Sequence, residues 1–293
     1  MNWNEMEERP NWPSELDEPV AKLGSPLEVY RTSRRKALLK LLLGIGLVLL
    51  GVLINYLYWW LFAGPVIPDK FFFLFLFGTP IAGLGLLYAA YRDRGMWVLE
   101  YPMGLLRWHR GEVVSFPWDE IFQMNLHRIT HCEDLQTKFD AQGEVESVAL
   151  DLEGASARIL GSYVMISRTD GVRAYFPSSL EGYAELGEKI QRETFKRLWP
   201  SMWERYQRGE MIQFDDLAIG WAGLLKGEES LPWLAFGGAK IANSRLIISR
   251  TGKWRAWTEV AIHDVDNPHL LLALLKAGQP LVATNSEGMR DEG

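Results

Sequence analysis

The sequence is poor in cysteine and has no excess of positive charge. Cys132 is its one cysteine, so no disulfide can form within the chain, and a disulfide-stapled secreted domain is excluded. The 31 lysines and arginines are outnumbered by 37 aspartates and glutamates, which gives a net charge of −6 at pH 7. A nucleic-acid-binding protein normally carries a basic face, so this balance argues against nucleic acid as a partner.

The signatures of several large enzyme classes are absent as well. There is no glycine-rich phosphate loop with its lysine, no His-Glu-x-x-His motif and no Gly-x-Ser-x-Gly nucleophile elbow. Gly237-Gly238 is followed by Ala239-Lys240, but the P-loop pattern is missing, and we interpret this segment as a break in a strand. The sequence therefore predicts a non-catalytic protein without a cofactor.

Long apolar runs, in contrast, are present in one part of the chain. Residues 41–63 contain Asn55 as their only strongly polar member, and residues 71–91 carry no charge. At about 1.5 Å per residue, about 20 residues span the roughly 30 Å hydrocarbon core of a bilayer. A cleaved signal peptide is disfavoured because the first run is longer than a typical h-region and no cleavage site follows it. The sequence predicts a transmembrane hairpin at residues 31–94, with helices at about 37–63 and 71–91.

The charges flanking this hairpin predict its orientation. Basic residues precede the first helix and follow the second, whereas the short linker between the helices holds one lysine balanced by one aspartate. By the positive-inside rule, both termini lie in the cytoplasm, and the protein is a multi-pass component of the cytoplasmic (inner) membrane. The flanking basic residues are Arg31, Arg34, Arg35, Lys36, Arg92 and Arg94.

The rest of the chain contains an internal repeat. Residues 166–175 align without gaps to residues 248–257, with six of ten positions identical. Two further anchors precede this segment in the same order in both copies. They are Gly-Leu-Leu-Arg at 104–107 with Gly-Leu-Leu-Lys at 223–226, and Ser-Phe-Pro-Trp at 115–118 with Ser-Leu-Pro-Trp at 230–233.

Each copy is predicted to be a set of short antiparallel strands closed by a helix. Alternating patterns around Asp170-Gly171 and Thr251-Gly252 predict hairpins, and Ser178 or Ser179 and Asn267-Pro268 are typical helix starts. Further strands are expected at 96–101, 104–109 and 112–118 and at 211–214, 223–226 and 230–236. The predicted organisation is a disordered acidic leader at 1–30, the hairpin at 31–94, a first module at 95–208 with an insertion at about 126–161, a second module at 209–278 and a disordered tail at 279–293.

A family resemblance rests on these features. The hairpin, the Gly-Leu-Leu-Arg strand, the segment Phe-Pro-Trp-Asp-Glu-Ile at 116–121 and the helix after Phe-Pro-Ser-Ser-Leu at 176–180 resemble a family of uncharacterised bacterial membrane proteins with pleckstrin-homology-like (PH-like) domains. The segments Leu23-Gly24 and Val29-Tyr30-Arg31 fit the same resemblance, which covers about residues 23–277. It implies a membrane α-helical hairpin plus an α+β soluble region, in which two tandem PH-like β-barrel or sandwich modules each end in a helix. It implies no reaction and no site residues.

Candidate binding residues come from the repeat. Arg168, Arg173, Arg250 and Arg255 lie on strands beside hairpin turns, where they could meet anionic lipid headgroups or a protein partner. Solvated strand edges explain the same arginines. Tryptophans also repeat, and we interpret them as barrel core rather than a ligand cage. These are Trp118, Trp233, Trp254 and Trp257.

The competing chemistry is a metal site. His127, His131 and Cys132 could form a three-ligand zinc site, with Glu133 and Asp134 close by in sequence. No second ligand pair follows at a characteristic spacing, so a polar surface loop is the favoured interpretation.

We therefore expect a membrane-anchored, non-catalytic protein whose PH-like domains contact a protein or lipid headgroups at the cytoplasmic face. A metal-dependent enzyme that uses the His127 and Cys132 region is the alternative, as is a sensor that relays the state of the bilayer to a cytosolic partner.

Overall fold

The computed structural model describes residues 13–61, 70–127, 131–132, 135–139, 145–150 and 162–278. The chain divides into two compact units. The first unit comprises Met1–Pro102, Leu106–Ser115 and Ser179–Glu181, and the second comprises Met103–Leu105, Phe116–Ser178 and Gly182–Gly293. The predicted disordered tail at 279–293 lies outside the described residues, as do residues 1–12 of the predicted leader.

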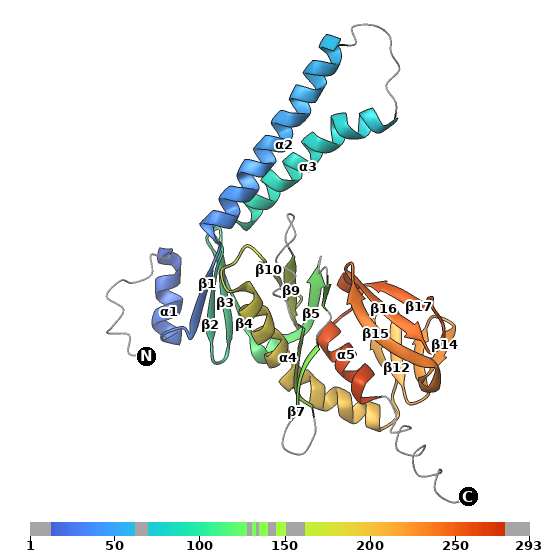
Figure 1. Cartoon of the computed structure of the whole chain (residues 1–293). Coiled ribbons are helices and arrows are strands. Elements are labelled where there is room, and N and C mark those ends of the chain that lie inside the picture. The colour runs from blue at the N-terminus through green and yellow to red at the C-terminus, as the bar shows by residue number, and fades with distance from the viewer. Residues whose placement is uncertain are drawn as a thin grey trace, which may run out of the picture. The chain divides into compact units, whose positions relative to one another are not determined.

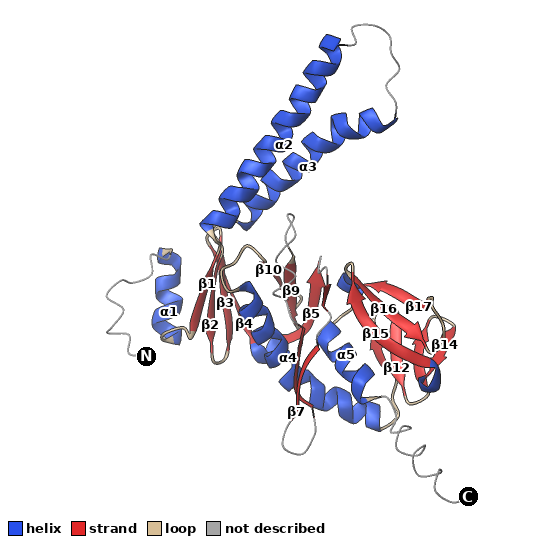
Figure 2. Ribbon diagram, viewed as in Figure 1, coloured by secondary structure: helices blue, strands red, loops and turns tan. Residues whose placement is uncertain are grey.

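Two long helices dominate the first unit. Helices α2 (Arg34–Leu61) and α3 (Lys70–Asp93) pack against each other as an antiparallel hairpin (Figures 1 and 2). Each begins and ends within a few residues of the predicted helices at 37–63 and 71–91. The residues between them, 62–69, lie outside the described part of the chain.

The expected disorder of the leader, residues 1–30, is wrong for most of its described part, from Ser14 onward. These residues form the short helix η2 (Ser14–Leu16), helix α1 (Asp17–Leu23) and strand β1 (Glu28–Arg31). The Leu16 side chain is fully buried in a cluster with Leu99, Tyr101 and Leu106, which anchors the helical segment. Acidic residues in the first turn of α1 favour the helix electrostatically, so an excess of acids does not by itself indicate disorder here.

Strand β1 is the first strand of a four-stranded sheet in which the helical hairpin α2–α3 is an insertion. The sheet order is β1-β2-β3-β4, and β1 pairs antiparallel with β2, Glu28 opposite Glu100 and Arg31 opposite Trp97. The helices α2 and α3 thus leave the sheet after its first strand and return to its second. The remaining strands are β2 (Trp97–Tyr101), β3 (Gly104–His109) and β4 (Glu112–Pro117).

The second unit holds the remaining strands and two helices. A three-stranded sheet of order β10-β9-β5 is followed by helix α4 (Tyr183–Gln207), which contains Pro200. A four-stranded sheet of order β11-β12-β13-β14 and a sheet of order β17-β16-β15-β6 come next, and helix α5 (Pro268–Ala277) follows them. The strands of the three-stranded sheet are β5 (Ile121–His127), β9 (Tyr163–Arg168) and β10 (Arg173–Pro177). The other strands are β11 (Ile212–Phe214), β12 (Leu217–Gly220), β13 (Gly223–Lys226), β14 (Glu229–Pro232), β15 (Phe236–Ala242), β16 (Arg245–Arg250) and β17 (Ala256–Ala261).

The predicted insertion forms short strands of its own. Strand β6 (His131–Cys132) pairs with the edge of β15, and β7 (Leu135–Phe139) pairs with β8 (Val145–Leu150).

The internal repeat extends to the register of the strands. A short helix follows the fourth strand in both copies, η3 (Trp118–Glu120) and η5 (Trp233–Ala235). The Thr169 amide donates to the Glu120 carbonyl at 2.9 Å, and the equivalent Thr251 amide donates to the Ala235 carbonyl at 2.9 Å. The next strand bulges at the same position in both copies. The pairs that flank the bulge are Ile121–Arg168 and Gln123–Ser167 in the first copy and Phe236–Arg250 and Gly238–Ser249 in the second.

Two equivalent glycines explain why the Gly-Leu-Leu anchor repeats. Gly223 has φ +139°, and a Cβ built there would overlap the carbonyl oxygen of Leu231. Gly104, with φ +159°, makes the same close approach to the carbonyl oxygen of Phe116. Each glycine lets its strand lie against the strand that follows it, so no side chain can be accommodated.

The strand predictions need two corrections. The counterpart of β2 is β12, which was not predicted, and the predicted strand at 211–214 is instead the counterpart of β1. The strand expected at 230–236 ends at Pro232, because the η5 turn follows it. Apart from β6, β7 and β8 of the insertion, each copy has seven strands and a closing helix among the described residues, so the second module is as complete as the first.

Helix α5 is held against the three-stranded sheet β10-β9-β5 of the first copy. Asn267 occupies the N-cap position of α5 in a left-handed conformation, φ 49° and ψ 56°, as predicted from Asn267-Pro268, but its side chain makes no capping hydrogen bond to the helix. Its amide nitrogen donates to the Met124 carbonyl at 2.8 Å, and its side-chain oxygen accepts from the Met124 amide at 2.9 Å. Its side-chain nitrogen donates to the Phe122 carbonyl at 3.1 Å. Asn267 thereby satisfies backbone groups at the edge of β5.

The contact between α4 and α5 contains a buried histidine that should make stability depend on pH. His269 is fully buried, its Nε2 lies 3.1 Å from Thr194 Oγ1, and burial lowers its pKa to about 3. The unfolded chain binds a proton at His269 below its ordinary pKa of about 6.5 while the folded chain does not, so stability is present above that pH and lost below it. Acidification from pH 8 to pH 5 should remove about 2 kcal/mol through His269 alone.

Chemical unfolding of the full chain in a mild detergent at the two pH values checks this expectation. A His269→Leu chain should lack this part of the acid destabilisation, whereas a control His263→Gln chain, changed at an exposed histidine on η6 (Ile262–Asp264), should keep it. Equal acid sensitivity of the His269→Leu chain and the unaltered chain would show that His269 is not the group responsible.

Candidate functional site

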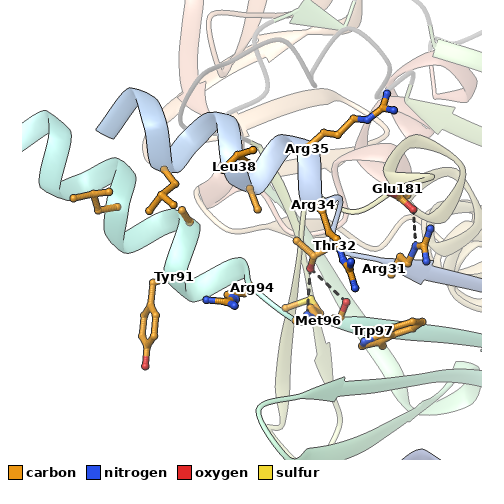
Figure 3. A pocket seen from close by; sticks show the side chains of 15 residues that line it. Arg31, Thr32, Arg34, Arg35, Leu38, Tyr91, Arg94, Met96, Trp97 and Glu181 are labelled. Atoms are coloured by element: carbon orange, nitrogen blue, oxygen red, sulfur yellow. Dashed lines mark hydrogen bonds and ion pairs between the residues drawn. The ribbon is translucent and has the colours of Figure 1, made fainter. Parts of the chain in front are cut away.

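A pocket of about 980 Å³ lies at the base of the helical hairpin, entirely within the first unit (Figure 3). Residues at the start of α2 and the end of α3 line it, together with residues at the ends of β1 and β2 and Glu181. Its cationic lining is Arg31, Arg34, Arg35 and Arg94, and its apolar lining includes Leu38, Leu41, Leu87 and Ala90. The pocket therefore joins a basic part to an apolar part that continues onto the hairpin.

Thr32, which lines this pocket, forms hydrogen bonds with the backbone of Met96 and Asp93. Its amide donates to the Met96 carbonyl at 3.1 Å, and its hydroxyl accepts from the Met96 amide at 3.2 Å. The same hydroxyl donates to the Asp93 carbonyl at 2.7 Å. In Figure 3, Arg34 and Arg94 project from the adjacent helix ends on either side of Thr32 and Met96. A single threonine thus ties the strand before the hairpin to the strand after it.

Among the described residues, three of the four arginines have no carboxylate partner. Arg31 pairs with Glu181 at 2.9 Å, and both side chains are about half exposed. Within the part of the chain that the structure describes, no carboxylate lies within ion-pairing distance of Arg34, Arg35 or Arg94. Three uncompensated guanidinium groups beside one cavity attract an anion, and guanidinium binds carboxylate or phosphate with two parallel hydrogen bonds.

Beside the pocket, a buried ion pair locks the two helices together. Lys40 on α2 lies 3.1 Å from Asp93 Oδ2 on α3, and the Asp93 side chain is 3% exposed. Arg92 reaches the other carboxylate oxygen of Asp93 at 3.1 Å, and the Ser179 hydroxyl lies 3.4 Å from Oδ2. Asp93 is already paired with Lys40 and Arg92, so its charge does not neutralise the arginines of the pocket.

The pocket suits an amphiphile with an anionic head. A phosphate or carboxylate would meet Arg34 and Arg94, and an attached hydrocarbon chain would run along Leu38, Leu41 and Leu87. The described lining holds no nucleophile paired with a base.

One described helix passes the length and composition test for a membrane span, Arg34–Tyr58 of α2. Only 11% of its most apolar stretch is buried, unlike the core helix of a soluble protein. Large apolar side chains also point outward from the described part of α3, with Phe77, Ile81, Leu84 and Tyr88 each more than half exposed. An apolar surface of this extent on both helices is unfavourable in water.

The repeated arginines do not gather into one site. Arg168 on β9 is engaged by Asp170 and by Glu120, the latter at 3.3 Å. Arg173 on β10 is exposed, and so are Arg250 and Arg255 around the β16–β17 turn. Arg255 stacks over the Trp254 ring, with its guanidinium carbon 4.7 Å from the ring centroid. Arg168 is thus neutralised by carboxylates, whereas Arg173, Arg250 and Arg255 are exposed.

The tryptophans of the repeat also separate into two groups. Trp118 and Trp233 are buried, as a core interpretation requires, and the Trp233 indole nitrogen donates to the Gly220 carbonyl at 3.0 Å. The core interpretation is wrong for Trp254, whose side chain is 88% exposed in the β16–β17 turn. Trp254 takes the place of Val172 in the first copy, and a turn position at the end of a hairpin faces away from the sheet core.

The zinc hypothesis is not supported by the described side chains. His127 ends β5 and stacks on Tyr163 at 4.3 Å and on His263 at 5.5 Å between ring centroids. His131 and Cys132 form β6 beside β15, and their side chains lie outside the described part of the structure. Among the side chains that are described, no three His, Cys, Asp or Glu residues gather where they could hold a metal ion. Zinc binding at His127, His131 and Cys132 stays a prediction.

The pocket was not predicted from the sequence, in which the same arginines served only as orientation signals. The Lys40–Asp93 pair was not predicted either, although a lysine near the start of the first predicted helix and an aspartate just after the second were a usable signal. Charged residues at the edges of adjoining apolar runs often pair with each other.

Comparison with known proteins points to a family whose role is itself undefined. A family of unknown function (DUF6585) matches residues 145–284, slightly less than half of the chain. The matched range runs from β8 through α4 and includes the whole second module. No curated protein and no solved structure is detectably similar. The similarity supports an uncharacterised family and assigns no ligand or reaction.

Proposed function

We propose that this chain is a multi-pass protein of the cytoplasmic membrane that holds the headgroup of an anionic phospholipid in the pocket at the base of its α2–α3 hairpin. In this proposal both helices cross the bilayer, both termini are cytoplasmic, and the β modules act without catalysis. The observation that carries the proposal is the pairing of three uncompensated arginines with an apolar wall that continues onto exposed hydrophobic helix surface.

Several properties of the hairpin support membrane insertion. The 25 residues of Arg34–Tyr58 correspond to about 37 Å of helix, enough for a hydrocarbon core of roughly 30 Å with some tilt. The pocket lies at the start of α2 and the end of α3. In an inserted hairpin, these helix ends would lie at the depth of the lipid phosphate groups. Tyr91 and Trp97 add aromatic side chains of the kind that prefer this interface.

The modules are proposed to be PH-like. Support comes from the order of elements in each copy, which is four strands, a short helical turn, three strands and a closing helix. In this arrangement the membrane hairpin would be an insertion between the first two strands of the first PH-like module. The modules would then be carried at the bilayer surface, where they can contact lipid headgroups or a protein partner.

Native mass spectrometry of the full chain, released from nanodiscs of phosphatidylcholine and phosphatidylglycerol, tests lipid binding. The unaltered chain should retain one phosphatidylglycerol in preference to phosphatidylcholine. Each charge-assisted hydrogen bond is worth about 1.5–3 kcal/mol, so an Arg34→Gln/Arg94→Gln chain should lose at least roughly tenfold in retention of the anionic lipid.

The matched control is Arg208→Gln. Arg208 is an exposed arginine at the end of α4 that pairs with Glu204 and Glu210 and does not line the pocket. Its loss should leave lipid retention unchanged. Equal retention of both lipids by the unaltered chain, or equal loss in all variants, would contradict a headgroup site at the hairpin base.

A further inference from the structure

Three large apolar side chains are exposed at one end of the second module. Trp254 in the β16–β17 turn is 88% exposed, Leu234 in η5 is 79% exposed, and Trp221 in the β12–β13 turn is 64% exposed. Hydrogen bonds bring the three segments together. The Trp233 indole donates to the Gly220 carbonyl at 3.0 Å, and the Thr251 amide donates to the Ala235 carbonyl at 2.9 Å.

Cations flank these apolar side chains. Arg250, Lys253 and Arg255 come from the same turn as Trp254, all three are exposed, and no described carboxylate lies within ion-pairing distance of any of them. We call this surface the tryptophan cap, meaning Trp221, Leu234 and Trp254 with Arg250, Lys253 and Arg255. Tryptophan beside uncompensated cations matches the chemistry of a bilayer interface, where an aromatic ring lies among headgroups and cations meet phosphate.

The internal repeat supplies a comparison within one chain. In the first copy, the positions of Leu234, Ala235 and Gly252 hold carboxylates, which are Asp119, Glu120 and Asp170. Two of these acids neutralise Arg168, the equivalent of Arg250. The third, Asp119, pairs with Arg197 of α4 at 2.7 Å. The second copy therefore keeps the arginine, lacks all three acids and has a tryptophan where the first has Val172.

All of these differences make the surface of the second copy less acidic or more apolar than that of the first. Each exchange removes negative charge or adds apolar surface at the same end of the fold, while buried equivalents such as Trp118 and Trp233 are retained. A surface that only needed to be soluble would gain nothing from an exposed tryptophan and leucine. We propose that the tryptophan cap docks onto the surface of a bilayer that contains anionic lipid, as a second membrane contact independent of the hairpin-base pocket.

Spin labels at two turns of the same sheet test this proposal in the full chain. In a Cys132→Ser background, one label is attached at Ala222→Cys, beside Trp221, and the other at Glu228→Cys, in the β13–β14 turn at the opposite end of β13. Both positions are exposed. The chain is reconstituted in vesicles of phosphatidylcholine with phosphatidylglycerol or of phosphatidylcholine alone.

In vesicles with phosphatidylglycerol, collisions with oxygen relative to a water-soluble nickel complex should rise several-fold at residue 222 and stay unchanged at residue 228. Trp254→Ser should abolish the rise, and Arg250→Gln/Lys253→Gln should remove its dependence on phosphatidylglycerol. A label at residue 222 that stays accessible to nickel in both vesicles would overturn the proposal while leaving the pocket intact. A label shielded from both reagents would also overturn it, because that result indicates a protein rather than a lipid as the occupant.

Discussion

Replacing Gly223 by alanine should destabilise the second module by about 3 kcal/mol or more. The alanine would have to adopt φ +139°, a conformation that costs an L-residue about 1–3 kcal/mol, and its methyl group would overlap the backbone of Leu231 and Pro232. Neither obstacle can be relieved by a side-chain rotation, because the opposing atoms are backbone. Chemical unfolding of the full chain in a mild detergent, followed by tryptophan fluorescence, measures the loss.

Gly227 provides the control for this prediction. It lies at the other end of β13 with φ +57°, and no atom lies within 4 Å of the place where its Cβ would be. Gly227→Ala should therefore cost only the strain of a left-handed residue, about 1 kcal/mol. Equal effects of the two substitutions would show that the close approach at Gly223 is not what the repeated glycine maintains.

Removing Asp93 should have the second large effect. Asp93→Asn leaves Lys40, whose side chain is 12% exposed, without its partner at the base of the hairpin. An unpaired buried charge costs about 3–5 kcal/mol, so the midpoint of thermal unfolding of the full chain in detergent should fall strongly. The reason is the stranded ammonium group rather than the lost attraction alone.

A double variant separates these two causes. Lys40→Met/Asp93→Asn removes the stranded charge, so it should be more stable than Asp93→Asn alone. Lys40→Met alone should be the mildest of the three, because Arg92 still lies 3.1 Å from the Asp93 carboxylate. A double variant less stable than Asp93→Asn would rule out the buried pair as the source of the effect.

Much of the architecture could be predicted from the sequence. Both hairpin helices, the repeat, the start of α5 and the strands β3 and β13 follow from apolar runs and local spacings. Strand β1 could not be predicted in this way. It has four residues, and its partner β2 lies beyond both helices, so its pairing is a long-range contact without a local signal. Strand β12 was hidden for a related reason, because its four residues are all buried and show no alternation.

The sites were harder to predict than the fold. The sequence places Arg34 and Arg94 beside apolar runs, but only the structure shows that they share a cavity and that Asp93 is already engaged by Lys40 and Arg92. Repeat position alone suggested that Trp254 is buried like Trp233, whereas its turn geometry exposes it. An alignment of the two copies by charge would have revealed the loss of acids around Arg250. That comparison requires knowing which turns meet at one end of the module.

The proposed function depends on the α2–α3 hairpin being embedded in a bilayer. Fractionation of cells that express the full chain, with an alkaline carbonate wash followed by ultracentrifugation, tests it most directly. The chain should remain in the pellet after the wash and enter the supernatant only when detergent is added. A chain recovered without detergent in the supernatant, folded and monodisperse, would contradict membrane insertion, and the headgroup pocket would lose its physical basis with it.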